Sequence, residues 1–411
     1  MNTPAGHVSQ RLRRTHTFDG AADLGMSGRA ADLELHLDGA SRGLVDTTHF
    51  DVARFPPPDW ALPAFVRAAG RGTNAYTGYR GGSEPRARCA EAIADLMGIT
   101  VHPDRNLVLT PGTQGALFAA LSALVDPGDR VALTDPEYLF SERILRFLGA
   151  TVVRIPLVMG PQGLDPDLGR LAGAASDGGI RLFLTSNPNN PTGAVYSPAA
   201  VRGIAELAAS HDFLVVVDEL YCRLVYDGTP YAHLAGEPGM ASRTVTLLGG
   251  SKTESLTGYR VGVAVASDEI ADAIEQVIAI SALRSPAYSQ HVLTSWLRDD
   301  SEFVRDRVSQ LRTIQRSTAD RLQQIPGVTV QPGAGTAYLW PDVSALRISS
   351  LEVARLLRAE AGVIVSPGYQ FGPSGATRFR VCYAQDEARW GPALGRMADV
   401  LGALAESASR R

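Results

Sequence analysis

Short apolar runs alternate with amphipathic stretches through the middle of this 411-residue chain. Runs that few polar residues interrupt are typical of parallel strands buried on both faces of a sheet. The pattern predicts strands at residues 107–110, 131–134, 152–155, 182–185, 213–217 and 244–248. It predicts helices at residues 60–69, 85–97, after 111–114, and at 140–147, 164–174 and 198–210. We therefore expect a large α/β domain over residues 65–294, with a mainly parallel sheet covered by helices on both faces.

The pattern changes near residue 300, where a long arginine-rich amphipathic helix is expected at residues 303–322. Strands at 328–331, 336–340 and 378–383 and a helix at 351–361 follow, which indicates a smaller α+β domain over residues 295–411. Residues 1–64 are interpreted as an N-terminal segment that joins this small domain. Within it, the alternation of Leu33, Leu35 and Leu37 hints at a strand, and prolines favour extended chain at 46–58.

Composition excludes several classes of protein. The net charge of −4 gives no general attraction to nucleic acid or membrane, and no apolar run is long enough to span a bilayer. Cys89, Cys222 and Cys382 lie far apart, so neither a disulfide framework nor a metal site is expected. A reducing cytoplasm is the natural location. The first 18 residues contain no acid, which fits an organellar presequence or, more simply, a polar tail.

Lys252 is the only lysine among 39 basic residues. Arginine can replace lysine at a solvated surface, but it cannot lose its proton and form an imine. An arginine-rich genome explains why lysine is scarce, but not why the one lysine lies between Gly250-Ser251 and Gly258-Tyr259-Arg260. We interpret Lys252 as the residue that carries an aldehyde cofactor through a Schiff base.

Several polar residues follow the expected strands, where open α/β sheets bind their ligands. Residues 112–114 open a helix, whose free N–H groups favour an anion, although these residues taken alone more often form a bare helix cap. Asp218 ends the run at 213–217 and could pair with a protonated pyridine nitrogen or cap a helix. Tyr221 could bond a ring hydroxyl and Tyr138 could stack on a ring, or both could be packed core residues.

Two arginines could bind anions. Arg260 could hold a phosphate and Arg380 a substrate carboxylate, each through paired N–H groups. In a chain this rich in arginine, either one alone reads as a surface charge. The order and spacing of all the candidates together favour a binding site.

That order resembles the class I/II aminotransferase superfamily of pyridoxal 5′-phosphate enzymes, of fold type I, over residues 45–400. Residues 186–193 (Ser-Asn-Pro-Asn-Asn-Pro-Thr-Gly) are similar to its Asn-Pro-x-Asn-Pro-Thr-Gly signature. Ser251-Lys252 followed by residues 258–262 (Gly-Tyr-Arg-Val-Gly) is similar to its lysine motif. The resemblance implies an aminotransferase that moves the amino group of an L-α-amino acid to a 2-oxo acid, acting as a homodimer.

The resemblance also implies roles for matched positions. Lys252 would hold the cofactor and then move the Cα proton, and Asp218 would face the pyridine nitrogen. Gly112, Thr113, Ser251 and Arg260 would bind the phosphate, with Gln114 beside them. Tyr138 would stack on the ring, and Asn190 and Tyr221 would contact the ring hydroxyl. Tyr76 would reach the partner's phosphate across the dimer, and Arg380 would bind the substrate carboxylate.

Two acids depart from the family pattern. Asp51 stands where a glycine is common near the substrate carboxylate, and Glu254 stands where an aromatic is frequent. They could select a cationic substrate or favour elimination, replacement, cyclisation or oxidation, or they could face away from the site. Arg284 could reach a distal substrate group. A regulator with this fold is also conceivable, but residues 1–45 are short for a DNA-binding domain with a linker.

Overall fold

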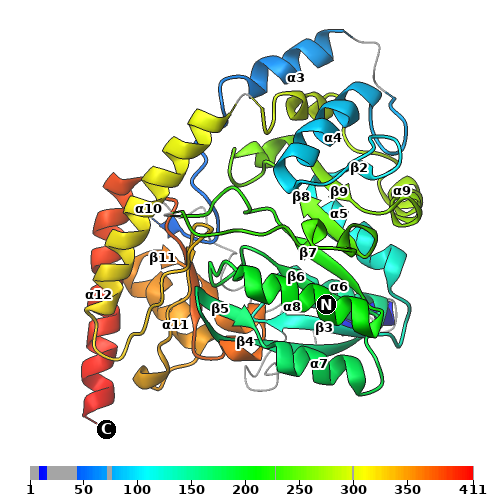
Figure 1. Cartoon of the computed structure of the whole chain (residues 1–411). Helices are drawn as coiled ribbons and strands as arrows, with labels where there is room; N and C mark the ends of the chain where they lie inside the picture. The colour runs from blue at the N-terminus through cyan, green and yellow to red at the C-terminus, as the bar shows by residue number, and fades with distance from the viewer. Residues whose placement is uncertain (1–8, 16–43, 72–75, 227, 299, 411) are drawn as a thin grey trace.

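The computed structural model describes residues 9–15, 44–71, 76–226, 228–298 and 300–410. In these ranges the largest sheet has eight strands in the order β2-β9-β8-β7-β6-β3-β4-β5 (Figure 1). The strands are β2 (Leu107–Thr110), β3 (Arg130–Asp135), β4 (Thr151–Gly160), β5 (Gly163–Pro166), β6 (Leu182–Ser186), β7 (Leu214–Asp218), β8 (Thr244–Leu248) and β9 (Gly262–Val265). The five central strands, from β8 to β4, pair in parallel. The prediction of a mainly parallel sheet is confirmed.

The uninterrupted apolar runs supply both faces of this sheet. Val131 and Leu133 contribute to one core and Ala132 to the other, because successive side chains of a strand point to opposite faces. The first core includes α5 (Gly112–Leu124), α6 (Leu139–Leu148) and α9 (Asp268–Ser281). The second includes α7 (Leu168–Ser176) and α8 (Pro198–His211). A third core packs α3 (Ala61–Gly70) and α4 (Ser83–Met97) against β2 and β9.

The C-terminal part forms a smaller unit with its own core. Its elements are α10 (Ser301–Gln323), β10 (Tyr338–Leu339), α11 (Ser350–Leu356), β11 (Val363–Ile364), β12 (Ser366–Pro367), β13 (Phe379–Cys382) and α12 (Glu387–Ser409). The helices α10 and α12 lie side by side along one edge of the molecule (Figure 1). Near the N-terminus β1 (Val45–Asp46) pairs in parallel with β11. The domain boundaries after residues 64 and 294 stay predictions.

Two local predictions are wrong. The helix expected at 164–174 begins only at Leu168, because residues 163–166 instead form β5, an antiparallel partner of β4. The carboxylate of Asp165 holds this strand in place by accepting bonds from N and Oγ of Ser197 at 2.7 and 2.8 Å. Residues 328–331 are not a strand but make an isolated bridge at Thr329. The helix expected at 351–361 is present, as α11 followed directly by a π-helical turn at Leu357–Ala361.

Other elements were not expected from the sequence, namely β9, α9 and α12. The short helix α1 (Gln10–Arg14) packs against α6. The alternation at residues 33–37 lies outside the described residues. Short helical turns complete the described part: η2 (Leu234–Gly236), η3 (Met240–Ser242), η4 (Leu256–Tyr259), η5 (Ser289–Thr294), η6 (Ser344–Leu346), η8 (Gly368–Phe371) and η9 (Pro373–Gly375).

Candidate active site

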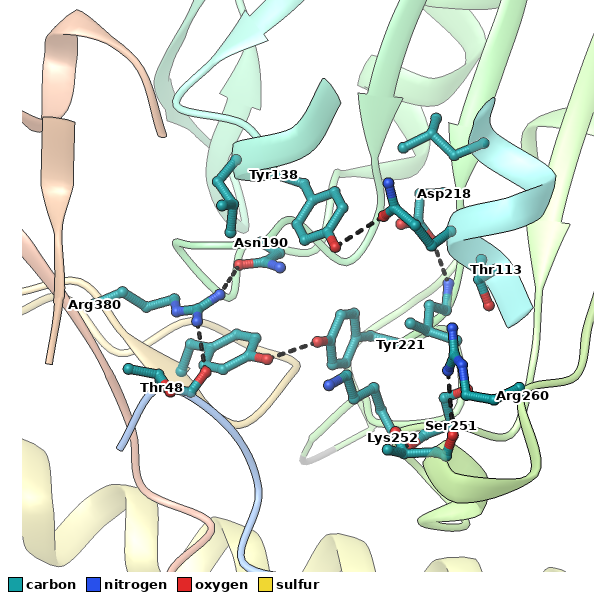
Figure 2. A pocket seen from close by; sticks show the side chains of 16 residues that line it. Thr48, Thr113, Tyr138, Asn190, Asp218, Tyr221, Ser251, Lys252, Arg260 and Arg380 are labelled. Carbon is teal, nitrogen blue, oxygen red and sulfur yellow. Dashed lines mark hydrogen bonds between the residues drawn. The ribbon is translucent and has the colours of Figure 1, made fainter. Parts of the chain in front are cut away.

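A cavity lies beside the carboxyl end of β7, between the large sheet and the small domain (Figure 2). Ten of the fifteen candidate site residues named from the sequence line it, although they come from segments as distant as residues 113 and 380. The complete lining is Thr48, Thr113, Gln114, Leu117, Tyr138, Leu139, Asn190, Asp218, Leu220, Tyr221, Ser251, Lys252, Thr257, Arg260, Tyr338 and Arg380.

One end of the cavity is suited to a phosphate. Helix α5 begins at Gly112 without a side-chain cap, so its first N–H groups are available to an anion. The hydroxyl of Thr113 is buried and has no hydrogen-bond partner among the described residues. A Cβ on Gly112 would lie 2.5 Å from Nη2 of Arg260, and one on Gly262 would lie 2.5 Å from N of Thr113. Gly112 therefore leaves room for the guanidinium of Arg260 at the start of α5, and Gly262 lets the start of β9 approach the same turn of the helix.

Asp218 supplies a buried carboxylate on the floor of the cavity. It ends β7, and one of its oxygens accepts a hydrogen bond from N of Leu220 at 3.0 Å. Burial raises the pKa of Asp218 to about 6; Glu219 adds to this rise, while the Leu220 N–H and the charge of Lys252 oppose it. A buried carboxylate with a raised pKa favours a cationic partner in the cavity.

Tyrosine side chains flank the middle of the cavity (Figure 2). The hydroxyl of Tyr138 donates to Oε1 of Gln114 at 3.0 Å, which fixes the ring beside the start of α5. Glu137, the preceding residue, bonds both N and Oγ of Ser186 at 2.9 and 2.6 Å, which joins this loop to the loop that carries Asn190. The hydroxyl of Tyr221 lies 2.8 Å from that of Tyr338.

Arg380 occupies the opposite end of the cavity, on β13. Its Nη1 donates to Oδ1 of Asn190 at 2.9 Å, and its Nη2 donates to O of Thr48 at 2.7 Å. Its Nε is buried without a partner among the described residues. The oxygens that bond this guanidinium are therefore uncharged, and Arg380 can bind a substrate carboxylate through paired N–H groups.

Lys252 lines the cavity from the loop between β8 and η4, with Nζ 5.7 Å from the ring centroid of Phe50. Behind this loop Glu254 pairs with Arg223, whose Nη2 also bonds Oδ1 of Asp300 at 2.6 Å. Burial raises the pKa of Glu254 to about 7, and Arg223 opposes this rise. Glu254 therefore belongs to a buried ion cluster under the lysine loop and does not line the cavity.

Three other predicted residues do not line the cavity. The carboxylate of Asp51 accepts bonds from N of Ala53 and N of Arg54 at 3.0 and 3.2 Å, so it closes a turn and does not line the cavity. Thr48, three residues earlier, lines the cavity in its place. Tyr76 is 80% exposed, with its ring centroid 5.0 Å from Cζ of Arg284. Arg284 is likewise outside the cavity lining.

Sequence reasoning missed Thr48 and Tyr338. Thr48 lies in a stretch that was expected only to be extended, and Tyr338 lies in an expected strand without a recognisable motif. The alternation of that strand around Tyr338 could have indicated a buried face, but not which cavity the face borders. Both residues contact the segment around Arg380, so their roles depend on long-range packing.

The lining fits a phosphorylated pyridine aldehyde. The uncapped start of α5, the unpartnered hydroxyl of Thr113 and Arg260 match a phosphate. Asp218 matches a ring nitrogen, and Lys252 offers the amine that an aldehyde requires. Over the described residues, the structure shows no cluster of three or more potential metal ligands. Over the same residues, no helix has the length and apolar character needed to cross a membrane.

Known proteins are similar to this chain in sequence and in fold. The family model "Aminotransferase class I and II" matches residues 48–396. An aspartate/prephenate aminotransferase of Thermus thermophilus is 31% identical over 398 residues, which cover 95% of this chain and 98% of the relative. An arginine–pyruvate transaminase of Pseudomonas aeruginosa is 30% identical, with 79% of this chain and 83% of the relative covered.

A solved structure extends the likeness to three dimensions. The crystal structure of an aspartate aminotransferase from Rhodobacter sphaeroides superposes with a TM-score of 0.84 at 36% identity. The match covers 91% of this chain and 98% of that one. The eight-stranded sheet and the small domain therefore form one fold that both chains share.

Proposed function

Because this chain belongs to the class I and II aminotransferases, we propose that the cavity around Lys252 is the site where it performs transamination. The family depends on pyridoxal 5′-phosphate, and the chain is a pyridoxal-phosphate-dependent aminotransferase. One observation carries the assignment of the site: Lys252, Asp218 and Arg380, which lie far apart in sequence, line a single cavity.

Each end of the cavity has a task in this proposal. Thr113, Ser251, Arg260 and the N–H groups at Gly112 bind the phosphate of the cofactor. Arg380 binds the α-carboxylate of the amino acid through paired N–H groups. Fixing both ends orients the substrate Cα toward Lys252, and such positioning lowers the barrier by reducing the freedom of the reacting groups.

Proton transfer at Cα is the task of Lys252. When bound, pyridoxal phosphate supplies an electron-withdrawing ring that stabilises the charge left after the Cα proton departs. Nζ of Lys252 takes that proton as a general base and returns it as a general acid. Asp218 keeps the ring nitrogen protonated through a charge-assisted hydrogen bond. Asn190 and Tyr221 orient the ring hydroxyl, and Tyr138 stacks on the ring with Gln114 holding its hydroxyl.

The acids that kept other reactions open lie outside this arrangement. Asp51 closes a turn and Glu254 pairs with Arg223. Neither carboxylate lines the cavity, so neither favours elimination, replacement, cyclisation or oxidation over transamination.

The half-reaction tests the function directly. The cofactor-loaded protein is given each of the twenty amino acids alone, and its absorbance spectrum is recorded. We expect at least one L-α-amino acid to convert the cofactor fully to its amine form, and a 2-oxo acid to restore the starting spectrum. A loaded protein that no amino acid in the panel converts would contradict the proposal. The panel also identifies the amino donor.

We further propose that the enzyme is a homodimer in which Tyr76 reaches the phosphate bound by the partner subunit. Tyr76 is exposed and lies outside its own cavity, stacked on Arg284. Its exposed side chain is accessible to a group on a second subunit. The apolar side chains of Ile280 and Leu283 are exposed near Arg284 in the sequence, which fits an interface on this side.

Subunit mixing tests the dimer. Tyr76→Ala is expected to weaken cofactor binding about 10-fold, the loss of one good hydrogen bond. A Lys252→Ala subunit cannot form a working site of its own, because it lacks the amine that attaches the cofactor. When the two variants are refolded together at equal concentration, about a quarter of the sites regain Tyr76 and Lys252 together, because half of the dimers are hybrids with one complete site. A mixture in which no site binds the cofactor with wild-type affinity would contradict the contact across the dimer. A monomeric mass by light scattering would contradict the dimer itself.

A further inference from the structure

Tyr338 is the side chain that joins the two ends of the cavity. It lies on β10 and is 2% exposed. β10 pairs with β13, the strand that carries Arg380. The ring centroid of Tyr338 is 4.2 Å from Cζ of Arg380, and its hydroxyl is 2.8 Å from that of Tyr221. One residue thus contacts both the proposed carboxylate site and the proposed cofactor site.

We propose that Tyr338 is a positioning residue with two separable roles: its ring holds the guanidinium of Arg380 for the substrate carboxylate, and its hydroxyl donates to Tyr221 so that the Tyr221 proton points at the ring hydroxyl of the cofactor. The proposal rests on the function proposed above, and it adds a residue that no motif identifies.

The ring role follows from the surroundings of Arg380. No carboxylate of the described residues pairs with this arginine within ion-pair distance. Its guanidinium instead lies against the faces of Tyr338 and Phe371, at 4.2 and 4.9 Å from Cζ to the ring centroids. A cation over an aromatic face is stabilised without being neutralised. The aromatic rings therefore fix the orientation of Arg380 and leave its charge available to the substrate.

The hydroxyl role follows from counting donors. A phenol has one hydrogen to donate and can also accept. If Tyr221 donated to Tyr338, it could only accept from the cofactor. If Tyr338 donates, the hydrogen of Tyr221 stays free to point into the cavity. Burial and then the neighbouring Tyr338 raise the pKa of Tyr221 well above its usual value, so Tyr221 keeps this proton.

Phe371 provides a matched control. It lies in η8 and shares the guanidinium of Arg380 with Tyr338, but it has no hydroxyl. A change at Phe371 can therefore affect carboxylate binding and cannot affect Tyr221 through a hydrogen bond. A core tyrosine with a purely packing role would show no such separation, because its truncation would disturb both ends together.

Three variants separate the roles: Tyr338→Phe, Tyr338→Leu and Phe371→Leu. The measurements are the dissociation constant of the apo-protein for pyridoxal phosphate and the KM and kcat for the amino donor. For Tyr338→Phe we expect about 10-fold weaker cofactor binding and a lower kcat, with KM changed less than about 2-fold. For Phe371→Leu we expect KM to rise about 10-fold with cofactor binding unchanged. Tyr338→Leu should show both effects.

Two results would overturn the proposal. One is a Tyr338→Phe protein that binds pyridoxal phosphate as tightly as the wild type, which excludes the hydroxyl role. The other is equal KM values for Tyr338→Phe and Tyr338→Leu, which excludes the ring role. Tyr338→Phe keeps the buried ring, so the first result is available even if the leucine variant does not fold. The cofactor measurement needs no turnover. If the wild type fails the half-reaction, the function is wrong, whereas the hydroxyl role is still decided.

Discussion

Lys252→Arg is expected to lower kcat by about 10⁴-fold, the upper end of what general acid–base catalysis contributes. Arginine keeps the positive charge and most of the length of the side chain, but its guanidinium does not lose its proton near neutral pH. It can therefore neither attach the cofactor nor take the Cα proton. Single-turnover absorbance measurements with the amino donor found in the panel provide the rate. A variant that retains more than a hundredth of the wild-type rate would contradict the assignment of Nζ as the base.

The single lysine gives this prediction a second readout that needs no turnover. Borohydride reduction of the loaded wild type followed by peptide mass mapping should locate a pyridoxyl adduct at Lys252, and Lys252→Arg should carry none. Arg67→Lys is the matched control, because it adds an exposed amine on α3 away from the cavity. We expect this control to keep full activity and to be labelled at residue 252 and not at residue 67. Labelling at both positions would indicate non-selective attachment.

The central strands were predictable because their environment is simple. A strand such as β6 is covered on both faces, so its sequence Leu-Phe-Leu-Thr-Ser begins with three apolar residues in a row, a pattern that can be recognised without knowledge of the neighbouring strands. The same logic placed Asp218 at the carboxyl edge of the sheet, where parallel strands end together. Positions that follow from strand direction alone were therefore available from the sequence.

Elements whose local pattern has two interpretations were not predictable. Leu164, Leu168 and Leu171 are spaced like one face of a helix, which is why β5 was misread. What makes residues 163–166 a strand is the antiparallel contact with β4 and the bonds from Asp165 to Ser197, both made by residues outside the window. Tertiary contacts here override the local periodicity.

The partners of the buried charged residues could not be predicted from the sequence either. Glu254 was noticed because it departs from the family pattern, but the sequence does not name Arg223 and Asp300 as its partners. Arg223 lies in the turn after β7, and Asp300 precedes α10. Charges buried at this depth require a partner, so a departure at one position is compensated by residues elsewhere in the chain. The sequence alone leaves open both a substrate role and a side chain that faces away from the site, and the partners of Glu254 decide between them.

Asp218→Asn is expected to have opposite effects on the loaded and the cofactor-free protein. With cofactor bound, the asparagine amide cannot supply the charge that keeps the ring nitrogen protonated, and we expect kcat to fall by about 10²- to 10³-fold. The contact between Asp218 and N of Leu220 can persist, because an amide oxygen also accepts. The loss is therefore expected in chemistry and cofactor affinity, measured by single-turnover rate and by titration of the apo-protein.

Without the cofactor, the Asp218→Asn variant should instead be more stable than the wild type above pH 6. Burial raises the pKa of Asp218 to about 6 from an ordinary value of 3.8. Between these values the folded chain keeps a proton that the unfolded chain has lost, so the contribution of this group to stability falls as the pH rises from about 4 to about 6 and stays low above it. Asparagine has no such dependence. At pH 7.5 we expect Asp218→Asn to raise the free energy of unfolding by up to about 3 kcal/mol, with the difference vanishing below pH 4. Urea unfolding of both apo-proteins across this range measures it, and equal stability at pH 7.5 would show that the carboxylate is already compensated without the cofactor.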